Sequence, residues 1–155
     1  VAVSQAETLT EIDQRVNHLK KALYDRAIHS EVQKCYIKDY LRADYYDAMF
    51  EAAKGSAECV RQISGLTTDG GTLFQTALSK NDPYIFFNAM KTDSERSEFT
   101  GLKELLESIF HLVQNHVAHT PKINWKTAET KALDILTLIL FAHKCLDKCH
   151  RIPGK

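Results

Sequence analysis

Residues 92–119 read TDSERSEFTGLKELLESIFHLVQNHVAH, and this stretch decides the fold. Thr92 and Glu95 have the spacing of a capping box, in which each side chain satisfies a backbone N–H at the start of a helix. Apolar residues then recur three or four positions apart, which is the period of one helix face. They are Leu102, Leu105, Leu106, Ile109, Leu112 and Val113. The pattern predicts one long amphipathic helix, with Pro121 as its latest possible end.

The N-terminal part of the chain shows the same kind of pattern. Thr8 and Glu11 form a second capping box, and apolar residues follow at helical spacing up to Leu23. Ser30 is a suitable N-cap for another helix, which runs through Leu41. The sequence therefore predicts two helices before residue 45.

Residues 45–63 predict a third helix that is rich in small side chains. Small side chains allow a neighbouring helix to approach closely, so we expect this helix to pack at the centre of the fold. The small residues are Ala48, Ala52, Ala53, Ser56 and Ala57. Gly65 is expected to end the helix, and Asp69-Gly70-Gly71 has the composition of a turn.

The remaining helices are predicted around an aromatic segment. A short helix is expected at residues 72–79, and Asn81, Asp82 and Pro83 interrupt it. We expect the side chains of residues 84–87, which follow this interruption, to fill part of the hydrophobic core. The last helix, at residues 125–150, is apolar around most of its circumference between positions 133 and 141, as expected for an enclosed helix. No segment alternates with period two, so the sequence predicts an all-α helical bundle with two long central helices.

Composition excludes several classes of protein. Lys plus Arg and Asp plus Glu both number 20, so no net positive charge attracts nucleic acid over a long distance. The four cysteines lack the spacing of a zinc knuckle and the density of a secreted disulfide scaffold, which favours a reduced, cytoplasmic setting. The longest apolar run, at 133–142, is too short and too interrupted to span a membrane. We expect no cofactor.

Two further features lie near the ends of the chain. Because the first residue is Val1, we expect an upstream domain, with residues 1–27 as a linking amphipathic helix and 28–155 as the helical domain. Cys145, Cys149 and His150 have zinc-binding chemistry. Two cysteines four residues apart with no second cluster are, however, more typical of packing.

The end of the long helix carries the main candidate site. His119 follows Asn115 by four residues, so both side chains lie on one helix face if the helix continues, and an imidazole and an amide can then hold one ligand. The alternative is that His116 and His119 simply continue the inward-facing apolar stripe. Taken alone, a histidine in such a stripe is more often a core residue than a catalyst.

From Ile28 to its end, the chain resembles the Ymh family of bacterial and prophage proteins, within the HEPN superfamily of helical domains. The resemblance rests on residues 46–54, which read YDAMFEAAK, on Ser94-Glu95-Arg96-Ser97-Glu98, on Gln114 to His119, and on Ala132-Leu133-Asp134. It implies a HEPN-like helical bundle and a connection with RNA.

At the motif, the family pattern is Arg-Asn-Pro, one variable residue, then Ala-His. Asn115, Ala118 and His119 match this pattern, whereas Gln114 and His116 stand in place of the arginine and the proline. The resemblance implies that the histidine moves protons while the arginine holds the scissile phosphate of RNA. Loss of one such electrostatic stabiliser typically slows a reaction by roughly a hundredfold to a thousandfold. Gln114 therefore predicts weakened or lost nuclease activity.

Three basic groups of the chain are candidates to replace the missing arginine. Protonated His116 would place a positive charge inside the motif. Arg96 lies too far along the helix to reach Gln114 in the same chain, about 27 Å away. In an antiparallel homodimer, Arg96 or Lys103 of a second copy would approach the motif.

Three functional hypotheses follow from the sequence. The leading one is an RNA-associated binding or regulatory module of prophage or phage-defence systems, dimeric through its long helices. The second is an active metal-independent endoribonuclease that uses His119 and Asn115, with help from His116. The third is a purely structural dimerisation domain whose upstream partner carries the function.

Overall fold

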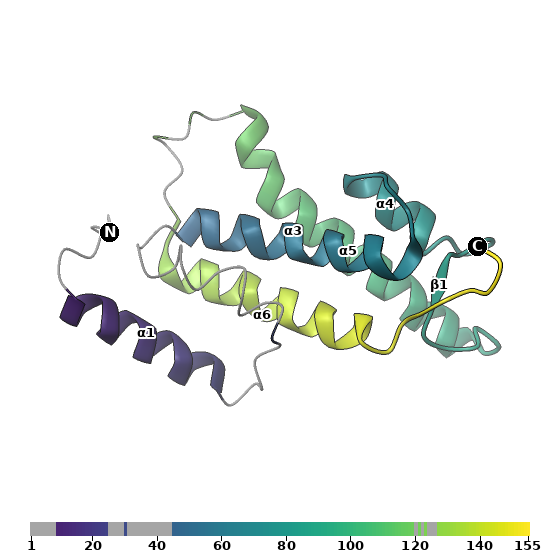
Figure 1. Ribbon diagram of the computed structural model, residues 1–155, viewed down its shortest axis with the longest axis horizontal. Coiled ribbons are helices and arrows are strands. Elements are labelled where there is room, and N and C mark those ends of the chain that lie inside the picture. The colour runs from purple at the N-terminus through teal and green to yellow at the C-terminus, as the bar shows by residue number, and fades with distance from the viewer. Residues whose placement is uncertain (1–8, 25–29, 31–44, 120, 122, 124–126) are drawn as a thin grey trace.

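The computed structural model describes residues 9–24, 30, 45–119, 121, 123 and 127–155, and for some of these, 115–119 among them, it describes the backbone alone. Figure 1 shows a helical bundle, which confirms the all-α prediction. Its helices are α1 (Leu9–Tyr24), α3 (Tyr45–Ser64), α4 (Gly70–Ala77), α5 (Asp93–His119) and α6 (Glu129–Leu146). Two short strands, β1 (Ile85–Phe86) and β2 (His150–Arg151), form an antiparallel pair.

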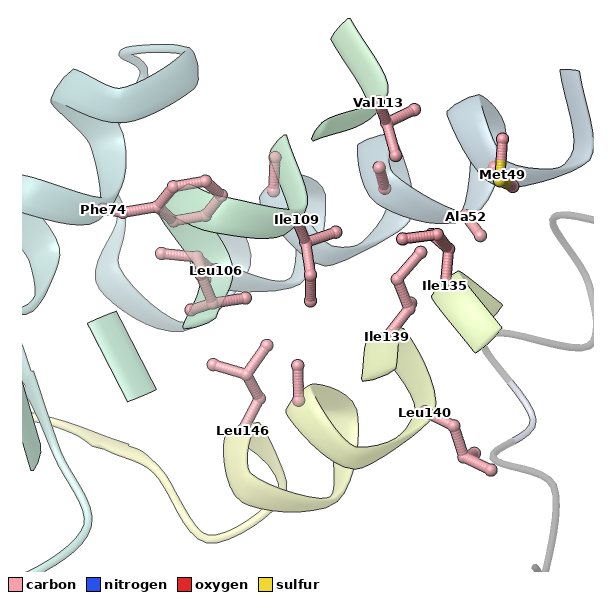
Figure 2. Close-up of a cluster of buried hydrophobic side chains, with 14 of the residues drawn as sticks. Met49, Ala52, Phe74, Leu106, Ile109, Val113, Ile135, Ile139, Leu140 and Leu146 are labelled. Carbon is pink, nitrogen blue, oxygen red and sulfur yellow. The ribbon is translucent and has the colours of Figure 1, made fainter. Parts of the chain in front are cut away.

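The core lies where α3, α5 and α6 pack against one another (Figure 1). The most extensive contact is between α3 and α6, and the small residues of α3 make it possible. Ala48, Ala52, Ala53 and Ala57 are all buried, which confirms the predicted packing role of this helix. Figure 2 shows larger side chains converging on them from the other helices. These include Phe74, Leu106, Ile109, Ile135 and Ile139.

Helix α5 begins with the predicted capping box. The Thr92 hydroxyl accepts the N–H of Glu95 at 3.1 Å, and the Glu95 carboxylate accepts the N–H groups of Thr92 at 3.1 Å and Lys91 at 2.7 Å. These hydrogen bonds lower the pKa of Glu95, and the one from Thr92 has a larger effect than the one from Lys91. The helix then continues without a break through position 116 to His119, as expected from the absence of proline there.

The connection from α3 to α4 differs from the prediction in its boundaries. Gly65 ends α3 as expected, with φ of 74° and its N–H bonded to the carbonyl oxygen of Arg61 at 2.7 Å. The glycine pair, however, forms the first turn of α4 rather than a turn before it, and α4 ends at Ala77. Gly70 has φ of 62°, and a Cβ at this position would lie 3.2 Å from the Phe110 ring. Only glycine combines this backbone conformation with this close approach.

The aromatic segment enters the core as a strand. Ile85 is fully buried, while Tyr84 and Phe87 pack against the core from its edge. Ile85 pairs with Arg151 and Phe86 pairs with His150, so the chain after α6 turns back to cover this segment. The predicted end of the last helix at His150 is therefore wrong: α6 ends at Leu146. Strands of two residues are too short to produce a period-two pattern in the sequence.

The expectation that the other helices enclose α6 between residues 133 and 141 is wrong for one face of the helix. Leu138 and Phe141 are 40% and 58% exposed, respectively, so one face of α6 is open to solvent among the described residues. Hydrophobic composition alone predicted burial, but the helices that pack against α6 cover only its other faces. None of the helices in the described residues combines the length and the hydropathy that crossing a membrane requires.

Several predictions fall outside the described residues. Ser30 is helical, but the rest of the helix expected through Leu41 is not described, nor is Thr8 of the first capping box. The domain boundary expected after residue 27 also lies in this undescribed part. Helix α1 approaches the bundle at the start of α6, where His18 Nδ1 lies 3.1 Å from Glu129 Oε1.

Candidate anion-binding site

Gln114, the first residue of the motif, lines a surface pocket of about 470 Å³. Phe110, one turn earlier on α5, lines the same pocket. Helix α3 contributes Lys54 and Arg61, and the start of α4 contributes Gly70. Three helices therefore meet beside Gln114.

A buried hydrogen bond fixes α3 against this part of α5. The hydroxyl of Tyr46 donates to the carbonyl oxygen of Val113 at 2.6 Å, and both residues are buried. Burial, and to a smaller degree the negative charge of Asp47, raises the pKa of Tyr46, so the phenol remains protonated as the donor. Because Val113 directly precedes Gln114, this bond determines which residues of α3 lie beside Gln114.

Arg61 links α3 to the start of α4. Its Nε donates to Glu58 Oε2 at 2.9 Å, and its Nη1 donates to the Asp69 carboxylate. A guanidinium has more N–H donors than two carboxylates use, so Arg61 retains capacity for a further acceptor. Its side chain is 25% exposed, whereas that of Asp69 is 86% exposed. Ion pairs with such exposed partners contribute only about 0–1 kcal/mol each, so a phosphate can compete with them.

Lys54 supplies the second positive charge of the pocket. Lys54 and Arg61 are seven residues apart, about two helical turns, and therefore share one face of α3. The Lys54 ammonium lies 2.8 Å from Glu51 Oε1 and 4.4 Å from the centre of the Phe50 ring. Both Lys54 and Glu51 are about half exposed, and this ion pair is also weak. An anion in the pocket would therefore meet two cationic side chains held by labile contacts.

The start of α4 adds a third favourable element. Asp69 is the N-cap residue, but its carboxylate bonds Arg61 and makes no capping hydrogen bond to α4. The first N–H groups of a helix carry partial positive charge and favour an anion. Gly70 lines the pocket, with the Phe110 ring packed close to it. The pocket thus combines a helix start, two cations, the Asp69 carboxylate and the amide of Gln114.

The remaining motif residues belong to the last turns of α5. Asn115, His116 and His119 are helical, but their side chains lie outside the described residues. The predicted convergence of Asn115 and His119 on one ligand stays a prediction. Of the four site residues predicted from the sequence, the structure places only Gln114 in a pocket.

Arg96 has a local structural role in this chain. Its guanidinium bonds the Asp93 carboxylate and donates to the carbonyl oxygens of Met90 and Lys91, each at 3.0 Å. These contacts hold Arg96 against the loop that leads into α5. The cations that lie beside Gln114 come instead from α3.

Sequence reasoning missed Lys54, Arg61 and Asp69 as site residues. One signal was present: Lys54 ends the segment 46–54 that carries the family resemblance, and Arg61 follows on the same helix face. The pattern looked like an ordinary solvated face of a helix. Nothing in the local sequence indicates that this face of α3 lies toward Gln114, because Lys54 and Arg61 are both 53 or more positions away from Gln114 along the chain.

The cysteines show little sign of metal-binding reactivity. Burial, followed by the nearby thiols of Cys145 and Cys59, raises the pKa of Cys149 to about 12, and burial also raises the pKa of Cys145. Both thiols are therefore harder to convert to the thiolate form that binds a metal ion. Across the described ranges, no three His, Cys, Asp or Glu side chains are grouped so as to hold a metal ion.

Comparison with known proteins gives one match. The family described as "Protein of unknown function (Hypoth_ymh)" matches residues 26–146, which is most of the chain. The chain belongs to this family. The matched span includes Lys54, Arg61, Asp69 and Gln114, so the whole pocket lies within the family domain. No curated protein and no solved structure matches the chain.

Proposed function

We propose that this member of the Hypoth_ymh family is a HEPN-like module that binds RNA through its phosphates, with weakened or lost nuclease activity. The observation that carries the proposal is the pocket of Gln114, in which Lys54 and Arg61 flank the start of α4. Prophage or phage-defence systems are the setting that the sequence resemblance implies.

The chemistry of the pocket suits a phosphate. Lys, Arg and helix N-termini are the groups that proteins most often use for phosphate oxygens. A volume of about 470 Å³ lies within the range of small-ligand sites and can hold a nucleotide unit. Because the chain as a whole is electrically neutral, attraction is local, and we expect binding to weaken steeply as salt rises.

The same geometry favours binding over cleavage. Transition-state stabilisation needs fixed donors whose charge is directed at the phosphate as it gains negative charge. Arg61 shares its charge with Glu58 and Asp69, and Gln114 offers only a neutral amide. The pocket can therefore hold a ground-state phosphate but supplies little additional charge to the transition state.

An active metal-independent endoribonuclease is the second candidate. One observation favours it: Lys54 and Arg61 bring cations to the pocket from α3 and so partly replace the arginine that Gln114 lacks. In this candidate, His119 and Asn115 carry out the proton transfers. RNA cleavage that resists a chelator and is lost in His119→Ala would establish it.

Fluorescence anisotropy of a labelled single-stranded RNA tests the proposal. The double variant Lys54→Gln and Arg61→Gln should weaken binding by about tenfold or more at low salt and reduce the salt slope by roughly one to two counterions. Arg96→Gln is the matched control, because it also removes an arginine paired with an aspartate, and its affinity should stay near wild type.

The outcomes separate the three hypotheses. If Arg96→Gln weakens RNA binding as much as the double variant does, the binding depends on general electrostatic attraction rather than on a specific site. If the unaltered chain binds no RNA at low salt, the proposal fails and a purely structural dimerisation domain remains. Circular dichroism of each variant verifies that the helices are retained.

A further inference from the structure

Three carboxylates bond the two cations of the pocket, and they do so from different places. Glu51 bonds Lys54 from three positions earlier on α3. Glu58 bonds Arg61 with the same spacing. Asp69 instead reaches Arg61 from the connection that leads into α4, and it lines the pocket. Asp69 therefore lies in the pocket itself, whereas Glu51 and Glu58 hold the cations from within their own helix.

The backbone of Asp69 is that of an N-cap residue. Its φ of −122° and ψ of 165° are extended, as is usual directly before a helix. In this conformation an aspartate can accept one of the first N–H groups of α4, that of Gly71 or Thr72. The carboxylate makes no such hydrogen bond and pairs with Arg61 instead. Rotation of one side chain therefore gives Asp69 a choice between two partners.

The two members of the ion pair between Asp69 and Arg61 differ in how firmly they are held. The Asp69 side chain is 86% exposed, and that of Arg61 is 25% exposed. Arg61 also donates through Nε to Glu58 Oε2 at 2.9 Å. Gln62 Nε2 in turn donates to Glu58 Oε1 at 3.3 Å. If the ion pair breaks, the guanidinium stays in the pocket and the carboxylate moves away.

We propose that Asp69 is a built-in competitor of the phosphate in this pocket. Its carboxylate occupies Arg61 until an RNA phosphate displaces it, and it then turns to the first N–H groups of α4. The exchange is nearly balanced, since an exposed ion pair is weak and an N-cap hydrogen bond replaces it. An N-cap side chain uses one N–H group, so the others remain available to the phosphate. This inference rests on the proposed function, because it concerns how the same pocket accepts phosphate.

The pocket lets a phosphate win this competition through a second contact. Asp69 is tethered beside Arg61, so a free carboxylate or a chloride ion gains no contact there that Asp69 lacks. A phosphodiester presents two free oxygens that match the donor fork of a guanidinium. Lys54 lies on the same face of α3 and binds the same phosphate or the next one. A ligand that contacts both cations therefore displaces Asp69 more readily than one that contacts Arg61 alone.

Fluorescence anisotropy of a labelled single-stranded RNA at low salt tests the proposal with two variants of the whole chain. Asp69→Asn removes the competing charge but keeps a side chain that can cap α4, so it should tighten RNA binding by about fivefold. Glu58→Gln is the matched control, because it neutralises the other carboxylate on Arg61 and also loosens the guanidinium. It should not tighten binding. General electrostatic attraction instead predicts equal tightening by both variants.

Amide hydrogen exchange measured by NMR tests the second half of the exchange of partners. Saturating RNA should slow the exchange of the Gly71 or Thr72 amide by about threefold or more in the wild-type chain, because the released carboxylate then accepts that N–H group. The same RNA should have no such effect in Asp69→Ala, which cannot cap the helix. Equal slowing in both proteins would show that the phosphate itself bonds these amides and would overturn the capping step.

The results separate this inference from the proposed function. If the wild-type chain binds RNA but Asp69→Asn binds less than about threefold more tightly than Glu58→Gln, the competitor role is overturned while the phosphate site stands. If neither the wild-type chain nor Asp69→Asn binds RNA, the proposed function fails as well.

Discussion

Helices α4 and α5 begin in opposite ways, and a pocket lies beside each start. At α5, the Thr92 hydroxyl accepts the N–H of Glu95, and the Glu95 carboxylate accepts the N–H of Thr92 in return. Arg96 bonds the neighbouring carbonyl oxygens and Asp93. At α4, the N-cap carboxylate of Asp69 bonds Arg61 instead of the helix. The start of α5 is therefore satisfied by its own side chains, whereas the start of α4 remains able to bind a ligand.

Pocket size does not distinguish the two regions. The pocket beside the start of α5 has a volume of about 550 Å³, and the one beside α4 has about 470 Å³. The larger pocket is lined by two basic and two acidic side chains. They are Lys80, Arg96, Asp93 and Glu104. The pocket beside α4 has two basic side chains and one acidic one, so the comparison teaches that the balance of charge, rather than the volume, favours an anion there. Three experiments probe this difference, from the largest expected effect to the smallest.

Restoring an arginine at Gln114 should have the largest effect. If the pocket holds the scissile phosphate, Gln114→Arg should raise the rate of RNA cleavage by roughly a hundredfold to a thousandfold. The matched control is Thr100→Arg, which adds the same side chain to the pocket beside α5 and should not raise the rate. The rate is measured by single-turnover cleavage of a labelled RNA in the presence of a chelator.

A second control combines Gln114→Arg with the loss of the imidazole at position 119. Activity gained by Gln114→Arg should disappear when His119→Ala is added. Tighter RNA binding without any cleavage would show that the pocket binds phosphate but lacks a positioned imidazole. No gain in either binding or cleavage would contradict the assignment of the pocket.

Two glycine substitutions should have opposite effects on stability. Gly70→Ala forces a side chain into the left-handed region and against Phe110, so it should lower the free energy of unfolding by about 1–2 kcal/mol. Gly101→Ala lies within α5 and meets no atom within 4 Å, so it should raise that free energy by about 0.5–1 kcal/mol. Urea denaturation of both variants provides the measurement. Equal stability of the two would show that the start of α4 is not constrained.

The capping box of α5 should give a small effect that depends on pH. Hydrogen bonds from the backbone N–H groups of Thr92 and Lys91 hold the pKa of Glu95 below its ordinary value of 4.5. The ionised carboxylate therefore stabilises the fold above pH 4.5, and this contribution is lost as the pH falls through the lowered pKa. Glu95→Gln should be less stable than wild type at pH 7, and the difference should shrink at pH 3. A difference that is the same at both pH values would refute this account.

Local signals in the sequence predicted most of the helices. The capping box at Thr92 and Glu95 placed the start of α5 to within one residue, because both partners lie within a single turn. Gly65 correctly predicted the end of α3, because a glycine with positive φ ends a helix through a hydrogen bond to the preceding turn. The start of α4 was two residues off, because glycines at positions 70 and 71 resemble a turn whether or not a helix begins at the first of them.

The candidate site was predicted only in part. Gln114 was recognised because it departs from a contiguous motif. Lys54 and Arg61 were missed, because the hydrogen bond from Tyr46 to Val113 that orients α3 against α5 joins residues 67 positions apart. The exposed face of α6 was missed because an apolar composition does not reveal how many neighbours a helix has.

The sequence by itself determined the helical class, the start of α5, the unbroken course of α5 through position 116 and the neutral amide at Gln114. Each depends on residues within a few turns of one another, and periodicity and capping act over that range. Only the tertiary structure decided that cations from α3 and the start of α4 surround Gln114 and that α6 keeps Phe141 exposed. These features depend on how whole helices pack, which is set by the combined fit of many side chains distant in the sequence.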